Sequence, residues 1–121
     1  MSEIINARIT KTSLGYEDHG ILTFGLGLDL AGGMFTTFGG YELDTYNKSS
    51  EKRVCLPYSM QLIVEIMETV GVEKWEDLQG KYIRVIDEGH NTPIRKIGNL
   101  MEDKWFDVCE FYNSNMGKEN E

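Results

Sequence analysis

The chain has 121 residues, of which 40% are hydrophobic and 26% charged. This length suits one hydrophobic core, and the composition excludes disordered and fibrous classes. The 20 acidic and 12 basic residues give a formal charge of −8, which disfavours nucleic-acid binding because that affinity comes mainly from Lys and Arg. An acidic surface suits basic protein surfaces or serves solubility alone.

The sequence carries no recognisable metal-binding or targeting signal. Cys55 and Cys109 show no zinc-ligand or disulfide-framework spacing, and the two histidines, His19 and His90, lie far apart. Residues 1–12 lack the basic opening and apolar run of a signal peptide, and no segment approaches the roughly 20 apolar residues of a membrane span. We therefore expect a cytosolic protein with no cofactor, no metal and no membrane contact.

The first half of the chain predicts strands joined by short connections. Apolar and polar residues alternate, as in half-buried strands, over residues 4–12, 21–30 and 34–38. The polar segment 13–20 is predicted to be a loop, and residues 31–33 a hairpin turn. Gly39 and Gly40 are expected to break or bulge the third strand. The polar segment 46–53 is predicted to be a mobile loop.

Two helices are predicted in the second half. Ser59 is expected to cap the first helix and Gly71 to end it. Its buried stripe is predicted from helical spacing to be Met60, Ile63, Val64, Met67 and Val70. Asp103 is expected to cap the closing helix. That helix is predicted to face the core with Trp105, Val108, Cys109 and Tyr112.

The remaining elements complete an α+β prediction. Residues 75–78 are expected to form a single turn with Trp75 plugging the core, and strands 81–86 and 92–97 to form a hairpin around the loop 87–91. The predicted architecture is an antiparallel sheet of about five strands in two hairpin-like groups, packed against one main helix and a C-terminal helix. The domain is expected to span residues 1–113, followed by a flexible polar tail at 114–121.

The predicted ligand-binding site lies on the glycine-bearing face of strand 21–30 and beside the preceding acidic loop. Glycines inside a strand mark a bulge, or a place where another backbone or a ligand comes close. Strand and turn geometry alone also explains them. The predicted site residues are Glu17, Asp18, His19, Gly25, Gly27, Gly39, Gly40 and Tyr41.

Three other chemical interpretations have weaker support. A histidine beside two acids suits a general base, but adjacent residues point in different directions, and no nucleophile or oxyanion motif accompanies His19. The stretch 25–30 superficially resembles a dinucleotide fingerprint, yet it leads into a hairpin rather than a helix. Trp75, Trp105 and Phe106 suit a recognition platform, although their helical spacing favours the core.

Several segments together carry a resemblance to a known family. They are residues 12–23 (TSLGYEDHGILT), 38–41 (FGGY), 75–81 (WEDLQGK), 97–99 (IGN) and 103–106 (DKWF). In this combination the chain resembles a family of small proteins encoded by tailed bacteriophages and prophages, most of which carry no assigned activity. The resemblance covers most of the chain, except the segment 47–52 and the tail after Asn113. It implies an origin and a fold rather than a reaction.

Small phage proteins outside the virion are often host-takeover or counter-defence factors, and this resemblance implies binding. Our leading hypothesis is a non-catalytic phage accessory protein that binds and modulates a host protein, for example a bacterial defence component. The second is a binder of a nucleotide-like ligand at the glycine-bearing face. An enzyme using Asp18 and His19 is third, and single-stranded nucleic-acid binding is disfavoured by charge. Assembly into a homo-oligomer is left open.

Overall fold

The computed structural model describes residues 2–89 and 92–115, within which eight strands and three helical segments are found. In chain order these are β1 (Glu3–Asp18), β2 (Ile21–Leu30), β3 (Phe35–Glu42), β4 (Asp44–Asn47), β5 (Lys52–Cys55), α1 (Ser59–Val70), the 3-10 helix η1 (Trp75–Leu78), β6 (Tyr82–Asp87), β7 (Lys96–Gly98), β8 (Trp105–Asp107) and α2 (Val108–Asn115). The side chain of Asp18 and residues 116–121, most of the predicted tail, lie outside the described residues, as do His90 and Asn91 of the predicted loop.

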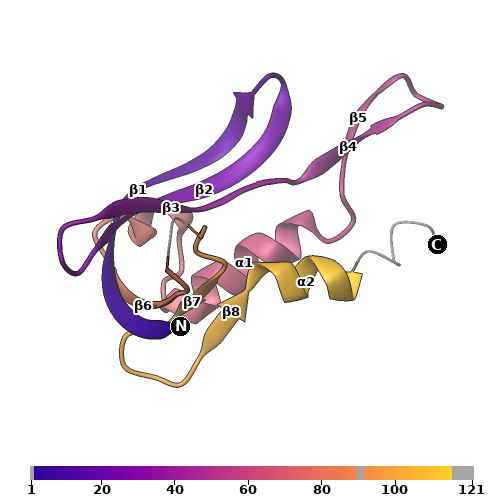
Figure 1. Ribbon diagram of the computed structural model, residues 1–121. Helices are drawn as coiled ribbons and strands as arrows, with labels where there is room; N and C mark the ends of the chain where they lie inside the picture. The colour runs from indigo at the N-terminus through magenta and orange to yellow at the C-terminus, as the bar shows by residue number, and fades with distance from the viewer. Residues whose placement is uncertain (1, 90–91, 116–121) are drawn as a thin grey trace.

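Six strands form one antiparallel sheet in the order β3-β2-β1-β6-β7-β8, and β4 and β5 form a separate two-stranded sheet. Figure 1 shows α1 and α2 together on one side of the sheet, while the β4–β5 hairpin projects away from it. An isolated bridge between Phe38 and Ile94 joins β3 to the segment before β7. The predicted single α+β domain is confirmed, with eight strands in place of about five.

The predicted loop over residues 13–20 is wrong, because β1 continues through it to Asp18. Pairing with β2 runs from Ala7 to Asp18 and outweighs the local preference of glycine and acidic residues for a loop. Only His19 and Gly20 make the connection. Both have positive φ, 51° and 83°, as a type I′ hairpin turn requires. The acidic segment is therefore the end of a long strand that pairs with β2.

The predicted strand 21–30 and the following turn are confirmed, and the glycine pair after them forms a bulge. The register of β2 and β3 shifts between Thr23 and Gly25. Gly39 has φ 114°, and a Cβ there would lie 2.8 Å from the carbonyl oxygen of Phe24. Only glycine fits so close to a neighbouring backbone. Beyond the bulge, β3 continues to Glu42.

The segment predicted to be a polar loop over residues 46–53 is instead the β4–β5 hairpin. An ion pair between the buried Asp44 and the half-buried Arg53 fixes its base, because Arg53 Nη2 lies 2.8 Å from Asp44 Oδ1. The Asp44 carboxylate also accepts a hydrogen bond from the backbone N–H of Leu22. Arg53 contacts Glu42 as well, at 3.3 Å. These contacts tie the hairpin to the end of β3 and the start of β2, which composition alone did not indicate.

Helix α1 ends at Gly71 as predicted, with φ 96° and a backbone bond to the carbonyl of Met67. The Ser59 cap is wrong, since Tyr58 occupies the N-cap position and no side chain caps the helix. The predicted stripe is rotated, because Met60 is 67% exposed. The buried residues of the helix are Leu62, Ile63, Ile66 and Thr69. Packing against the sheet determines which face of α1 is buried. Helical spacing alone was compatible with both the predicted stripe and the observed one.

The C-terminal region differs most from the prediction. Trp105–Asp107 is a strand, and α2 begins only at Val108 and continues to Asn115, past the predicted domain end. Asp103 therefore caps no helix and accepts a hydrogen bond from Trp105 Nε1. The second strand of the predicted 81–97 hairpin is also displaced, to Lys96–Gly98. Pairing of β8 with β7 overrides the helical spacing of the sequence.

The hydrophobic core lies between the sheet and the two helices. In η1 the fully buried side chain is Leu78, whereas Trp75, predicted to plug the core, is only half-buried. Among the described helices, none is long and apolar enough to cross a membrane. The largest fully buried side chains are Phe24, Phe38, Ile9, Leu26, Leu28, Leu43, Leu62, Ile66, Leu78, Ile83, Ile97 and Val85.

Candidate functional site

Five of the eight predicted site residues line one groove on the outer face of the β1–β2–β3 ribbon. The groove has a volume of about 270 Å³. Glu17 and the four glycines of the prediction, Gly25, Gly27, Gly39 and Gly40, line it. The rest of the lining comes from Lys11, from hydroxyl side chains and from the apolar residues Phe24, Leu26 and Phe38. The sequence therefore identified residues from three strands that the fold brings together.

Neighbouring atoms lie close to both glycines that β2 contributes to this glycine groove, Gly25 and Gly27. A Cβ at Gly27 would lie 2.9 Å from Cγ of Lys11 and 3.2 Å from Cζ of Phe35, so neighbouring side chains already fill that position. At Gly25 the nearest side-chain atom to such a Cβ is Ser13 Oγ, at 3.3 Å. Gly27 is thus explained by packing, and at Gly25 a side chain would require Ser13 to shift by a few tenths of an ångström.

Two of the other three predicted residues, His19 and Tyr41, do not line this groove. His19 is in the turn at the end of the ribbon and is exposed. For Asp18, the structure describes the backbone in β1 and not the side chain. Tyr41 contacts the aromatic core, with its ring 5.6 Å from Tyr112 and 6.4 Å from Phe24. Its side chain is therefore part of the packing between the sheet and α2.

Tyr41 has an altered titration for a structural reason. Burial raises the pKa of its hydroxyl, and a hydrogen bond with the thiol of Cys109, at 3.8 Å, raises it further. The hydroxyl of Tyr41 thus stays neutral within an aromatic cluster, as expected for a side chain that serves packing. This arrangement gives Tyr41 no role as a general base near neutral pH.

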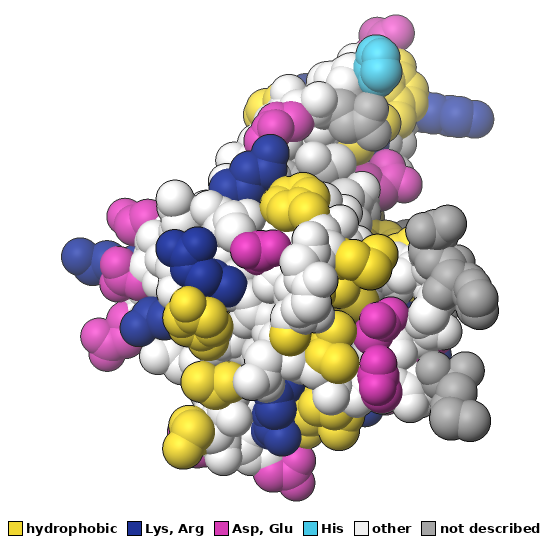
Figure 2. All heavy atoms as spheres, turned by 60° about the vertical axis from the view of Figure 1, so that its left-hand side comes forward, with side chains coloured by type: hydrophobic (Ala, Val, Ile, Leu, Met, Phe, Trp, Pro, Cys, Tyr) yellow, Lys and Arg dark blue, Asp and Glu magenta, His cyan; other side chains and the backbone are white. Residues whose placement is uncertain are grey.

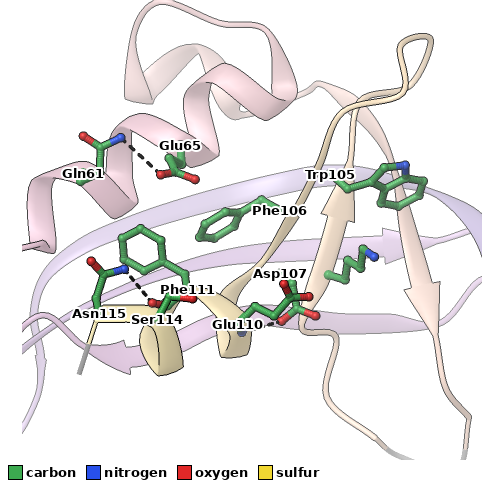
Figure 3. A pocket seen from close by; sticks show the side chains of 10 residues that line it. Gln61, Glu65, Trp105, Phe106, Asp107, Glu110, Phe111, Ser114 and Asn115 are labelled. Carbon is green, nitrogen blue, oxygen red and sulfur yellow. Dashed lines mark hydrogen bonds between the residues drawn. The ribbon is translucent and has the colours of Figure 1, made fainter. Parts of the chain in front are cut away.

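A second and larger groove, of about 560 Å³, lies between α1 and the β8–α2 segment. Figure 3 shows Gln61 and Glu65 of α1 on one side, and Asp107 and Glu110 on the other. Between them are the rings of two core residues, 4% and 9% exposed, which are Phe106 and Phe111. The half-buried Trp105 closes one end. We call this the acidic groove.

The charges around the acidic groove are unequal. Three carboxylates line it, from Glu65, Asp107 and Glu110, against the single ammonium group of Lys96. Lys96 Nζ also lies 5.8 Å above the ring of Trp105, within the range of a cation–π contact. By contrast, Figure 2 shows a face on which acidic and basic side chains are interspersed. The groove therefore combines an aromatic floor with an excess of negative charge.

The acidic groove was missed from the sequence because Trp105 and Phe106 were assigned to a helix. A signal for the correct helix start was present. Asp107 and Glu110 have the spacing of an N-cap and its third helical residue, and the backbone N–H of Glu110 does donate to Asp107 Oδ1 at 3.0 Å. Placing α2 after Asp107 would have moved both acids to one end of the helix.

Metal-ligating residues do not cluster in residues 2–89 and 92–115: no group of three or more His, Cys, Asp or Glu side chains is arranged to hold an ion. Cys55 and Cys109 are free thiols. Comparison of the chain with protein-family models, curated proteins and solved structures finds no match. The candidate sites are therefore judged on their own geometry.

Proposed function

We propose that this chain is a non-catalytic accessory protein of phage or prophage origin that binds and modulates a host protein through the acidic groove. The observation that carries the proposal is the lining of that groove, where three carboxylates surround two largely buried phenylalanine rings. Such a surface suits a partner segment that presents a Lys or Arg beside an apolar side chain. We propose a bacterial defence component as an example of such a partner.

The physical support comes from the way charge and aromatic area combine at interfaces. Aromatic residues supply contact area for binding, and complementary charge speeds encounter and selects the partner. Glu65 comes from α1 and Glu110 from α2, so both flank whatever enters the groove. A net charge of −8 adds a longer-range attraction for basic surfaces.

A pull-down from bacterial lysate tests this proposal with matched variants. We expect the wild-type chain to enrich a partner that is lost when Glu65→Gln and Glu110→Gln are combined, because the groove then loses two of its three carboxylates. The control combines Glu73→Gln and Glu76→Gln, exposed acids that do not line the groove, and has the same net charge. Equal capture by both variants, or no partner at any salt concentration, would contradict the proposal.

A second candidate function is binding of a small nucleotide-like ligand in the glycine groove. It is favoured by the convergence of Glu17, Gly25 and Gly39 on one concavity, with Lys11 to meet a phosphate. The exposed Phe35 ring lies beside it, over Gly27, and suits stacking on a base. The negative charge of Glu17 would repel a second phosphate group, so a ligand with few negative charges fits the groove best.

Thermal-shift screening against linear and cyclic nucleotides decides the second candidate. We expect a ligand to raise the melting temperature of the wild-type chain, and Gly25→Ala to reduce the shift, because the added Cβ lies in the groove lining and displaces Ser13 Oγ, 3.3 Å away. Gly15→Ala is the control, since a Cβ there meets nothing within 4 Å and the residue does not line the groove. An unchanged melting temperature across the panel would rule this function out.

A further inference from the structure

Strand β8 ends the six-stranded sheet, and only its neighbour β7 pairs with it in the part of the chain that the structure describes. The carbonyl of Lys104 accepts a backbone hydrogen bond from Asn99. The N–H of Val108 donates one to Arg95. In an antiparallel ladder such bonds recur at every second residue. Phe106, midway between these two positions, therefore also directs its backbone N–H and C=O toward β7.

Trp105 and Asp107 occupy the alternate positions, so their backbone groups point away from β7. Asp107 caps α2, since its Oδ1 accepts a hydrogen bond from the N–H of Glu110, and the carbonyl of an N-cap residue belongs to the first helical turn. Within residues 2–89 and 92–115, the N–H and C=O of Trp105 and the N–H of Asp107 have no backbone partner. These groups form the free edge of β8.

The acidic groove runs along this free edge. Trp105, Phe106 and Asp107 all line it, and consecutive strand residues point to opposite faces of a sheet, as Figure 3 shows for Trp105 and Phe106. A hollow that all of them line therefore lies at the edge, where the two faces meet. A second hollow, of about 440 Å³, shares Trp105 and Glu65 with the groove and adds Glu68 of α1. The free edge thus faces open space that is bordered by carboxylates.

We propose that the partner enters the acidic groove as an extended segment that pairs antiparallel with the free edge and adds a strand to the sheet. This inference rests on the proposed function and names the form of the segment that the groove takes. The backbone of the segment then bonds with the N–H and C=O of Trp105 and with the N–H of Asp107, as in other cases of strand addition. Because β8 has three residues, a short segment is enough to cover it.

The register determines which side chain of the segment meets the carboxylates. The residue opposite Phe106 lies on the same face of the sheet as Phe106, and Figure 3 shows this ring on the side of α1 and Glu65. A Lys or Arg fits there, because its methylene stem packs on the rings of Phe106 and Phe111 while its charged end lies toward Glu65. The two adjacent residues of the segment point to the other face, where Trp105 offers apolar area. The expected pattern is a basic residue between two apolar ones.

NMR titration of the isotope-labelled chain with the capped peptide Thr-Val-Arg-Val-Thr tests this pairing. We expect saturable binding that slows hydrogen exchange of the Trp105 and Asp107 amides about tenfold or more at saturation, because both become bonded. The Phe106 amide, already bonded to β7, should change little. N-methylation of both valines should weaken binding about tenfold or more, since their N–H groups face β8. N-methylation of the arginine, whose N–H points away from β8, is the matched control and should leave the affinity unchanged.

The same peptide with glutamate in place of arginine separates this inference from the proposed function. We expect it to bind at least about tenfold more weakly, because the groove lining is acidic. Binding that depends on the arginine but not on methylation of the valines would overturn strand pairing and leave the acidic groove as the partner site. Binding that is indifferent to the arginine would contradict the acidic groove itself. The absence of saturable shifts at millimolar peptide would also overturn the inference, while the pull-down still tests the proposed function independently.

Discussion

Replacing Phe38 with alanine is expected to lower the free energy of unfolding by about 3–5 kcal/mol. Phe38 is fully buried and contacts Phe24 of β2 and Phe106 of β8, with ring centroids 6.2 Å and 6.5 Å away. It also forms the bridge to Ile94. The change leaves a cavity where the two ends of the six-stranded sheet meet over the core.

Urea unfolding followed by circular dichroism measures this effect, and Phe35→Ala in the same strand is its control. Phe35 is 58% exposed, so its loss should cost about 1 kcal/mol or less. Similar losses for the two variants would contradict the inward orientation of Phe38. That orientation is set by the β2–β3 register, in which Phe38 lies opposite Leu26 and Phe35 opposite Asp29.

The second large effect is expected at the base of the β4–β5 hairpin. Asp44→Asn should destabilise the protein by about 2 kcal/mol at neutral pH, because it removes the charge that strengthens the hydrogen bonds from Arg53 and Leu22. Hydrogen bonds from the Arg53 guanidinium hold the pKa of the buried Asp44 carboxyl below its ordinary value of 3.8. The folded state therefore favours the charged form.

The sign of the pH dependence follows from this lowered pKa. The stabilisation by Asp44 is fully present above the unfolded value of 3.8 and is lost as the pH falls through the lower folded value. The stability difference between wild type and Asp44→Asn should therefore shrink between neutral pH and pH values below 3.8. Urea unfolding at several pH values measures it, with the exposed Asp29→Asn as control. A constant difference would contradict the charged pair.

The sequence-based predictions were most accurate where a local sequence pattern is compatible with only one local structure. Strand 21–30 was predicted to the residue, because its alternation is strict and a hairpin turn follows. Gly71 ended α1 as expected, since its left-handed conformation suits glycine. The four glycines of the predicted site also converge on one groove. In each case the local signal and the tertiary structure agree.

The prediction was wrong where a partner strand decides the structure. Residues 13–18 and 46–53 have loop-like composition, and only pairing along β1–β2 and within the β4–β5 hairpin, whose base the Asp44–Arg53 contact fixes, builds strands there. Trp105 and Phe106 satisfy helical spacing but pair with β7. The acidic groove depends on that change, because it brings Asp107 and Glu110 opposite Glu65. Neither contact can be read from a local window of sequence.

NMR spectroscopy of the isotope-labelled chain, titrated with the partner that the pull-down enriches, tests the central claim most directly. The indole N–H signals of the two tryptophans serve as probe and control. Trp105 lines one end of the acidic groove, whereas Trp75 does not line it. We predict that the Trp105 signal and the Glu65 and Glu110 backbone signals shift on binding, while the Trp75 signal stays in place. Binding that leaves the Trp105 signal unchanged would contradict the acidic groove as the partner site.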